Sequence, residues 1–385
     1  MPHSLERLRV GVAGLGAVAQ VVHLPLLGRR PDLFRLSAVC DVSGTVRNRV
    51  GERYGVATAR RYPDIAAMLE DAELDAILLL TPGSHGPDAR AILDAGLVVM
   101  CEKPLAYTVA EAEGLAAAMS SDTSDRLLLG YMKQYDPAVT RMLELLPQPQ
   151  SIRVIDVTVL HPCSAAQLAF AGTFPLPADV DPAVLTALRE AEGTAHERAL
   201  GTVAPGLRAL YSGVVLGSIV HDLSLIRMFT GSPVSVDHVD VWPDNALLND
   251  ASPGSLSASG RLATGAHFRV AWHYLPDYPA YRETVVVHHE TGSLQLVFPA
   301  PYLLNAPTEL TVVEAVGQHE RRSVHRSVVE AFEQELVALH AMITQGVPPL
   351  SSVPEGRADI ITGQQILRRY AAQSGIAIGG EAATA

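Results

Sequence analysis

Short apolar runs alternate with segments of helical periodicity along the first third of the chain. The apolar runs, which predict β-strands, are Leu8–Ala13, Leu36–Cys40, Asp75–Leu80, Leu97–Cys101 and Leu127–Gly130. The helical segments between them are Ala17–Leu27, Val46–Tyr54, Pro87–Asp94 and Val109–Met119. Because helices that join parallel strands make right-handed crossovers, this alternation predicts a doubly wound parallel sheet of α/β class over residues 1–130.

Beyond Tyr131 the pattern changes to alternation with a period of two, and few helices separate the runs. These runs are Ile152–Leu160, Ser257–Ala263, His267–Tyr274, Arg282–His288, Ser293–Phe298 and Glu309–Val313. They predict an α+β domain over residues 131–385, built on a large open, mostly antiparallel sheet. Amphipathic helices are expected at 327–343 and 358–372, and the second is expected to pack back on the first domain.

A long segment, residues 161–215, separates the first of these strands from a helix near Ser218. It contains a predicted helix at Pro182–Glu192. Long ordered insertions near active sites often act as lids or substrate-selecting loops, whereas others are surface embellishments or subunit contacts. Both interpretations stand.

Composition narrows the class of protein. The 385 residues are enough for two cores, and 48% hydrophobic with 18% charged residues is typical of a soluble globular chain. A net charge of −12 argues against nonspecific binding to nucleic acid or to anionic membranes. Three widely spaced cysteines and no visible signal peptide fit a reducing compartment. We therefore expect a cytoplasmic protein with a small-molecule partner.

A glycine-rich turn follows the first predicted strand. Gly14 to Ala19 spell G-x-G-x-x-A at the start of a helix. The first glycine permits the tight turn, and Gly16 lets a pyrophosphate approach the backbone at the helix N-terminus. This is the Rossmann dinucleotide fingerprint, and it predicts cofactor contacts at Gly14, Gly16, Ala17 and Val18.

An acid at the end of the second strand supports the fingerprint. The Asp41 carboxylate is placed to accept hydrogen bonds from the ribose hydroxyls of NAD and to repel the 2′-phosphate of NADP. The alternative is that Asp41 only caps the next helix. Arg47 and Arg49, which follow it, weaken the preference. NAD is therefore expected, with NADP less favoured.

Another group of chemistry-bearing residues follows the run 96–100. Glu102-Lys103-Pro104 stands at the predicted carboxyl edge of the parallel sheet, where open α/β folds bind their ligands. The proline lacks a backbone N–H donor, so the strand is not expected to continue past it.

Several motifs taken in order resemble one known family, the glucose–fructose oxidoreductase, inositol dehydrogenase and rhizopine-catabolism (Gfo/Idh/MocA) oxidoreductases. The motifs are Gly11–Gly16, His23-Leu24-Pro25, Ala38–Asp41, Thr81–His85, Cys101–Pro104 and Gly130–Pro137. The resemblance implies a Rossmann domain, an α/β domain with an open sheet, and a homodimer or homotetramer formed through that sheet. It also implies that Thr81, Pro82 and His85 line the nicotinamide side of the cofactor, and that Glu102 and Lys103 stand where cofactor and substrate meet.

The catalytic motif of the resembling family is incomplete here. Polyol-oxidising members carry Asp-x-x-x-His beside the lysine of Glu-Lys-Pro. The histidine corresponds to His221, but the acid position is Gly217 and a further acidic position is Ser224. Asp222 should point about 100° away from His221 on a helix, which favours a structural role for it. The insertion offers Glu190, Glu192 and Glu197 as candidates for the missing acid.

Oxidation of a secondary alcohol requires a group that takes the hydroxyl proton and one that stabilises the developing alkoxide. His221 suits the first role and Lys103 the second. The alternative makes Lys103 the proton-transfer group and His221 a substrate-positioning residue. Lys133, Tyr131, Tyr211 and Tyr281 are the candidate substrate contacts. No metal is expected, because the neighbours His288 and His289 point to opposite faces of a strand.

The predicted function is an NAD-dependent oxidoreductase acting on a secondary alcohol, or the matching ketone, of a sugar, sugar derivative or cyclitol. One alternative is an enzyme that retains NAD for transient oxidation during elimination or epimerisation. The other is an NAD-binding regulatory protein without turnover, an interpretation that Gly217 supports.

Overall fold

The computed structural model describes residues 7–70, 73–119, 126–163, 167–169, 171, 173, 179–243 and 253–385. The predicted insertion, 161–215, therefore lies partly outside the described residues. The chain forms two compact units. Unit 1 contains residues 1–130, 170–195 and 332–357, and unit 2 contains residues 131–169, 196–331 and 358–385.

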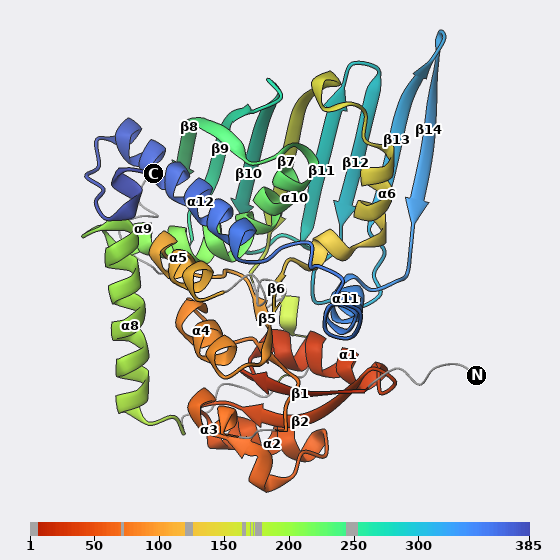
Figure 1. Ribbon diagram of the computed structural model, residues 1–385. Helices are drawn as coiled ribbons and strands as arrows, with labels where there is room; N and C mark the ends of the chain where they lie inside the picture. Colours follow the sequence, from red (N-terminus) through yellow and green to blue (C-terminus); the bar gives the residue numbers. More distant parts are fainter. Residues whose placement is uncertain are drawn as a thin grey trace. The chain divides into compact units, whose positions relative to one another are not determined.

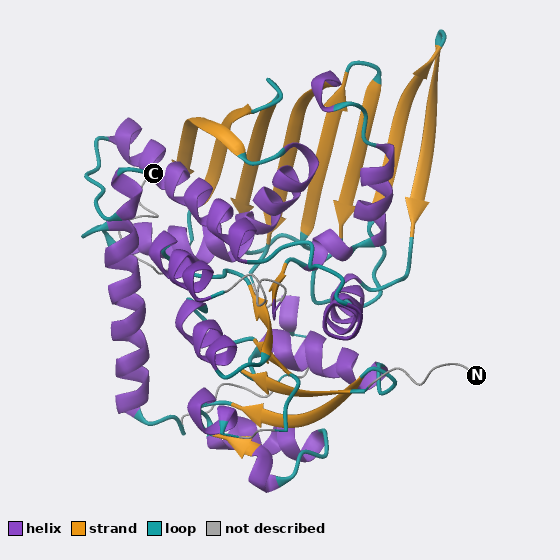
Figure 2. Ribbon diagram, in the orientation of Figure 1, coloured by secondary structure: helices purple, strands orange, loops and turns teal. Residues whose placement is uncertain are grey.

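Unit 1 is built on a parallel sheet of six strands in the order β3-β2-β1-β4-β5-β6. The strands are β1 (Leu8–Ala13), β2 (Phe34–Cys40), β3 (Arg61–Tyr62), β4 (Ala76–Leu79), β5 (Val98–Glu102) and β6 (Leu127–Gly130). Figure 2 shows the strands and the helices around them. The predicted doubly wound parallel sheet is confirmed. All residues of β4 are buried, as expected for a central strand, and those of the edge strand β6 are buried as well.

Some helices of unit 1 begin at a side-chain cap, whereas others have none. Ser43 caps α2 through the Val46 N–H, and Thr108 forms a capping box with Glu111 at the start of α5. The helical segments are η1 (Ala19–His23), α1 (Leu24–Arg29), α2 (Gly44–Arg53), η2 (Thr58–Arg60), α3 (Ile65–Leu69), α4 (Gly86–Asp94) and α5 (Val109–Ala118). Most of α11 (Ala331–Gln345) also belongs to this unit.

Unit 2 contains a sheet of eight strands in the order β14-β13-β12-β11-β7-β10-β9-β8. Only the β7–β10 pair is parallel among the described ladders of this sheet, so the expected mostly antiparallel sheet is confirmed. The strands are β7 (Ile152–His161), β8 (Pro233–Trp242), β9 (Ser255–Leu262), β10 (His267–Tyr274), β11 (Arg282–His289), β12 (Gly292–Phe298), β13 (Glu309–Val316) and β14 (His319–Arg326).

The longest apolar stretch of unit 2 is helical over Pro205–Thr230. By length and hydropathy this run could cross a membrane, but 72% of its most apolar window is buried inside the protein, as in a core helix. It comprises α9 (Pro205–Ala209), the π-helix η6 (Leu210–Ile219) and α10 (Val220–Thr230). The other helical segments are η4 (Met132–Tyr135), α6 (Pro137–Leu145), η5 (Pro149–Ser151) and η8 (Glu381–Ala383).

Two helices run from one unit into the other. They are α8 (Pro182–Leu200) and α12 (Val353–Ser374), both visible in Figure 1. Helix α8 is longer than the predicted Pro182–Glu192, because Gly193 and Thr194 do not end it. Helix α12 begins five residues before the predicted start, at Val353.

Candidate active site

The glycine turn after β1 has the geometry that a dinucleotide requires. Gly14 adopts φ +88°, and a Cβ at this position would lie 2.6 Å from the backbone of Leu80 and Thr81. Only glycine fits there. Gly16 is exposed, with nothing within 4 Å of its ideal Cβ position. Ala17 and Val18 start the helix that follows. The turn therefore leaves open backbone for a pyrophosphate at a helix start.

Asp41 connects this turn to the second strand. Its Oδ2 accepts the Leu15 N–H at 2.8 Å, and its Oδ1 accepts the Ser43 N–H at 2.8 Å. The cap of α2 is Ser43, so Asp41 does not have the alternative capping role. Arg47 donates to the carbonyl oxygen of Asp41 at 2.5 Å, which brings a guanidinium to the same strand end. Carboxylate oxygens retain further acceptor capacity in this arrangement.

The predicted nicotinamide residues form a turn at the end of β4. The Thr81 Oγ1 is buried and has no hydrogen-bond partner among the described residues. Pro82 is exposed, whereas the His85 ring is buried. His85 lies between two carbonyl oxygens, with Nδ1 2.7 Å from Pro104 and Nε2 2.6 Å from Thr81. Its ring therefore links the ends of β4 and β5.

Glu102 ends β5 with a buried carboxylate. The His23 Nε2 lies 3.1 Å from its Oε1, and its Oε2 accepts the Lys103 backbone N–H at 3.1 Å. Burial pushes the pKa of Glu102 upwards, but the hydrogen bond from His23 and the charges of His23, Lys103 and His85 outweigh this effect and lower it. Glu102 is thus an ionised group that holds the Lys103 backbone, while Lys103 itself is half-buried.

A second carboxyl lies behind this group. Glu335 of α11 is fully buried, and neither of its oxygens has a hydrogen-bond partner among the described residues. Burial, and next the charge of Glu102, raise the pKa of Glu335 well above its usual range. On the same helix the Phe332 ring packs edge-on against His23 at 5.5 Å. We call His23, Glu102 and Glu335 the Glu102 cluster. Sequence analysis missed Glu335, because no local motif marks it.

His221 lies in unit 2, near the start of α10. Its ring is 8% exposed and stands edge-on to the buried Tyr131 ring at 6.0 Å. Gly217 is in the π-helical segment η6, where an ideal Cβ would lie 2.9 Å from the Ser212 carbonyl oxygen. The backbone as folded therefore has no room for the acid that the resembling motif has at this position.

Asp222, the residue after His221, belongs to a buried cluster of polar side chains. Lys133 forms an ion pair with Glu283 of β11, and the Tyr281 hydroxyl donates to the same Glu283 oxygen at 2.5 Å. Asp222 is fully buried, and burial followed by the charge of Glu283 raises its pKa well above the usual range. The charge of Lys133 opposes this shift, and neither Asp222 oxygen has a hydrogen-bond partner among the described residues. We call Lys133, Asp222, Tyr281 and Glu283 the Glu283 cluster.

The remaining candidates are in varied surroundings. Tyr211 is fully buried in η6. Glu190, Glu192 and Glu197 are exposed, and of these Glu192 accepts the Tyr107 hydroxyl at 3.3 Å within unit 1. Lys103 belongs to unit 1 and His221 to unit 2, so their joint action stays a prediction. Within the described part of the chain, no three His, Cys, Asp or Glu side chains gather as metal ligands.

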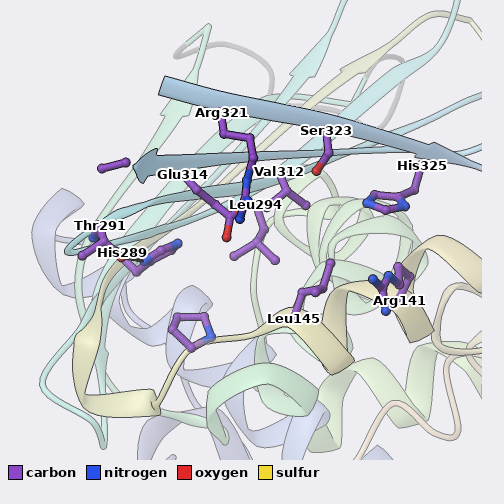
Figure 3. Close-up of a pocket in the computed structure, with 12 residues that line it drawn as sticks. Arg141, Leu145, His289, Thr291, Leu294, Val312, Glu314, Arg321, Ser323 and His325 are labelled. Carbon is purple, nitrogen blue, oxygen red and sulfur yellow. Dashed lines mark hydrogen bonds and ion pairs between the residues drawn. The ribbon is translucent and has the colours of Figure 1, made fainter. Parts of the chain in front are cut away.

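Unit 2 also has two open grooves. One, of about 560 Å³, contains Arg141, His289, Arg321 and His325, but none of the predicted site residues (Figure 3). Its arginines are already paired, Arg141 with Glu144 and Arg321 with Glu314. The other groove, of about 640 Å³, includes Tyr281 beside Arg282 and Phe298.

Comparison with known proteins identifies the first domain. The GFO_IDH_MocA model, an oxidoreductase family with an NAD-binding Rossmann fold, matches residues 8–130. Inositol 2-dehydrogenase 3 of Saccharopolyspora erythraea is 32% identical over 140 residues, which are 36% of this chain and 40% of that protein. D-glucoside 3-dehydrogenase of Escherichia coli is 35% identical over 130 residues, 34% of either chain. The match spans less than half the length of these relatives.

Solved structures extend the likeness of fold to nearly the whole chain. Aldose-aldose oxidoreductase from Caulobacter crescentus has a TM-score of 0.70 at 19% identity and covers 97% of this chain and 100% of its own. UDP-N-acetylglucosamine 3-dehydrogenase from Acidithiobacillus ferrooxidans has a TM-score of 0.67 at 18% identity, covering 94% and 98%. Residues 8–130 of this chain are thus matched to the NAD-binding Rossmann domain of the Gfo/Idh/MocA oxidoreductase family, and the solved structures show a similar fold over nearly the whole chain.

Proposed function

We propose that this protein is an NAD-dependent oxidoreductase that transfers hydride between the nicotinamide and a secondary alcohol, or the matching ketone, of a sugar, sugar derivative or cyclitol. The observation that carries the proposal is the Glu102–Lys103 turn at the carboxyl end of β5, in the same unit as an open glycine turn. A lysine held at this edge of a parallel sheet stands where such folds bind ligands.

The residues present fit a dinucleotide. At Gly14 there is no space for a Cβ, and at Gly16 the backbone is open. Asp41 follows the end of β2. When bound, NAD supplies the hydride acceptor or donor. Gly14, Gly16, Ala17 and Val18 would hold its pyrophosphate, Asp41 its ribose hydroxyls, and Thr81, Pro82 and His85 its nicotinamide side.

The chain's own side chains would manage the proton. In the oxidative direction His221 takes the hydroxyl proton, and the Lys103 ammonium stabilises the negative charge that develops on the oxygen. Lys133, Tyr131, Tyr211 and Tyr281 are proposed to contact other hydroxyls of the substrate. The alternative assignment exchanges the roles, so that Lys103 moves the proton and His221 positions a hydroxyl.

A substrate screen tests this function. Purified protein is mixed with NAD or NADP and a panel of aldoses, sugar acids, nucleotide sugars and inositols, and NADH absorbance is followed in both directions with the matching ketones. The expected result is substrate-dependent formation of NADH. Keto intermediates without net NADH would favour retained NAD in elimination or epimerisation.

The non-enzymatic alternative has one specific observation in its favour, the close contact that excludes a side chain at Gly217. A protein without turnover would bind NAD firmly and show no activity in either direction on the whole panel. That result would replace the proposed enzyme by an NAD-binding regulatory protein.

A further inference from the structure

The N-terminus of α2 is prepared for a negative charge. Helix starts present unpaired N–H groups and a positive dipole end, and in Rossmann domains the helix after the second strand stands beside the adenosine ribose. Here the Ser43 hydroxyl and the Thr45 N–H are the donors at that end, and Ser43 is bonded through its N–H to Asp41. A 2′-phosphate on the ribose would need donors of this kind.

Those donors are already taken by a carboxylate from the insertion. Asp179 Oδ1 accepts the Ser43 hydroxyl at 2.7 Å, and Asp179 Oδ2 accepts the Thr45 N–H at 2.7 Å. The two hydrogen bonds, first from Thr45 and then from Ser43, lower the pKa of Asp179, so it is ionised at neutral pH. Two carboxylates, Asp41 and Asp179, thus converge on Ser43.

Arg47 stands at the same place. An ideal Cβ on Gly44 would lie 3.6 Å from Asp179 Oδ2 and 3.7 Å from Arg47 Nη2, so both groups flank Gly44. An arginine near the second strand is the residue that usually accommodates a 2′-phosphate. Here Arg47 also donates to the Asp41 carbonyl oxygen, and it flanks the same glycine as Asp179. The cation that would favour NADP and the Asp179 carboxylate therefore both lie at the start of α2.

Asp179 lies in a turn three residues before helix α8. Two residues further on, Asp181 Oδ1 accepts the Ala183 N–H at 2.8 Å at the start of the helix. Later in the same helix Glu192 accepts the Tyr107 hydroxyl, which fixes α8 to unit 1. The Asp179 carboxylate is thus close in sequence to a helix that contacts Tyr107 of unit 1.

We propose that Asp179 is a specificity-determining residue that selects NAD over NADP, because its carboxylate occupies the hydrogen-bond donors at the start of α2 that a ribose 2′-phosphate would use. The inference rests on the proposed use of a nicotinamide dinucleotide. It assigns part of the insertion a role in cofactor selection, in addition to Asp41. Two negative charges placed together at a binding site repel each other, so the Asp179 carboxylate should weaken the binding of a 2′-phosphate.

Cofactor titration on the full chain tests the proposal without a substrate. Dissociation constants for NAD and for NADP are measured by calorimetry on the wild type, Asp179→Ala and Asp179→Asn, with Asp181→Asn as the matched control of the same segment. In Asp179→Ala we expect NADP to bind at least about tenfold more tightly, while the NAD constant changes less than about threefold. Asp179→Asn, which keeps an acceptor but not the charge, should fall between the two, and Asp181→Asn should match the wild type.

The outcomes separate this inference from the proposed function. If the wild type binds neither dinucleotide, the proposed function fails. If it binds NAD and Asp179→Ala leaves the ratio of the two constants unchanged at an unaltered melting temperature, the Asp179 inference alone is wrong. A wild type that prefers NADP overturns it as well. Should Asp179→Ala be poorly folded, Asp179→Asn gives the same decision, because it conserves shape and removes the charge.

Discussion

The chain has only two lysines, Lys103 and Lys133, among 29 basic Lys and Arg residues, and each is associated with a buried glutamate in a different unit. In unit 1 the Glu102 carboxylate bonds the backbone N–H of Lys103 and the ring of His23. In unit 2 the Glu283 carboxylate bonds the ammonium of Lys133 directly, and the Lys133 side chain is 8% exposed.

The difference concerns which part of the lysine is fixed. The Glu102 cluster fixes the backbone and leaves the stem of Lys103 half-buried, which suits a group that approaches a reacting oxygen. The Glu283 cluster pairs the Lys133 ammonium directly with the Glu283 carboxylate. Each cluster also contains a second acid, Glu335 or Asp222, whose pKa is raised by burial. Similar residue types therefore give a half-buried lysine with a fixed backbone in one place and a buried ion pair in the other.

The largest expected effect separates the two lysines by activity. Lys103→Ala should lower kcat about 10³-fold while the NAD dissociation constant stays within a factor of about three, because charge stabilisation at the reacting oxygen is lost. The measurement is steady-state turnover with the substrate found in the screen, alongside calorimetry. A Lys103→Ala enzyme with near-normal kcat would remove Lys103 from the chemistry.

The second prediction is that replacing Lys133 destabilises the protein more than replacing Lys103. Lys133→Met should cost about 3 kcal/mol of unfolding free energy, because it leaves the Glu283 charge buried without its cation. Lys103→Met, a replacement of the same length, should cost less than about 1 kcal/mol. Urea denaturation followed by circular dichroism measures both. Equal losses would mean that the Lys133–Glu283 pair is not a buried support.

The third prediction asks whether the missing acid can be restored beside His221. Gly217→Asp should destabilise the protein by about 2 kcal/mol and should not raise kcat, because its Cβ meets the Ser212 carbonyl oxygen. Gly213→Ala in the same helical segment is the control, since nothing lies within 4 Å of its ideal Cβ, and it should be neutral or stabilising by about 1 kcal/mol. A more active Gly217→Asp enzyme would show that η6 adapts to the acid.

The smallest expected effect is on the pH dependence of stability, to which the two buried acids Glu335 and Asp222 contribute. The folded pKa values of Glu335 and Asp222 are raised, so the folded state binds these protons more tightly than the unfolded state. Their contribution to stability is full below the unfolded pKa values, near 4, and is lost as pH rises towards the folded values.

Glu335→Gln and Asp222→Asn should each flatten this fall by at most about 1.4 kcal/mol per pH unit. Unfolding free energies measured from pH 5 to 8 test the slopes, with Glu333→Gln, on the same helix as Glu335, as the control. If neither variant changes its slope, the two carboxyls are not held protonated.

Local motifs in the sequence located unit 1 and its site. The fingerprint, Asp41 and Glu102-Lys103 each lie in a short segment with a recognisable pattern, and β1 and β6 were predicted with the observed bounds. Glu335 and Asp179 were not found, because their partners are far away in the sequence and no local pattern pairs them. The short elements β3 and α3 were also missed, since a strand of two residues carries no periodicity.

In unit 2 the sequence also left some buried residues and elements unpredicted. Glu283 occupies an inward position of β11, in register with the buried Val285 and Val287. A charged residue at an inward position of an alternating strand indicates a buried ion pair, so this signal was available in the sequence. Strands β8 and β14 were missed because polar residues interrupt them. Helix α6 was missed although it begins at an Asp136–Pro137 cap, which is a helix-start signal.

The burial of Lys133 has a practical consequence for chemical labelling. Amine-directed reagents react with accessible neutral amines, and Lys133 is enclosed and ion-paired. Lys103, which is half-buried, is the less enclosed of the two lysines of the chain. Acylation followed by mass spectrometry would therefore report on the occupancy of the Lys103 turn directly, and protection by a bound cofactor or sugar would provide a binding assay that needs no turnover.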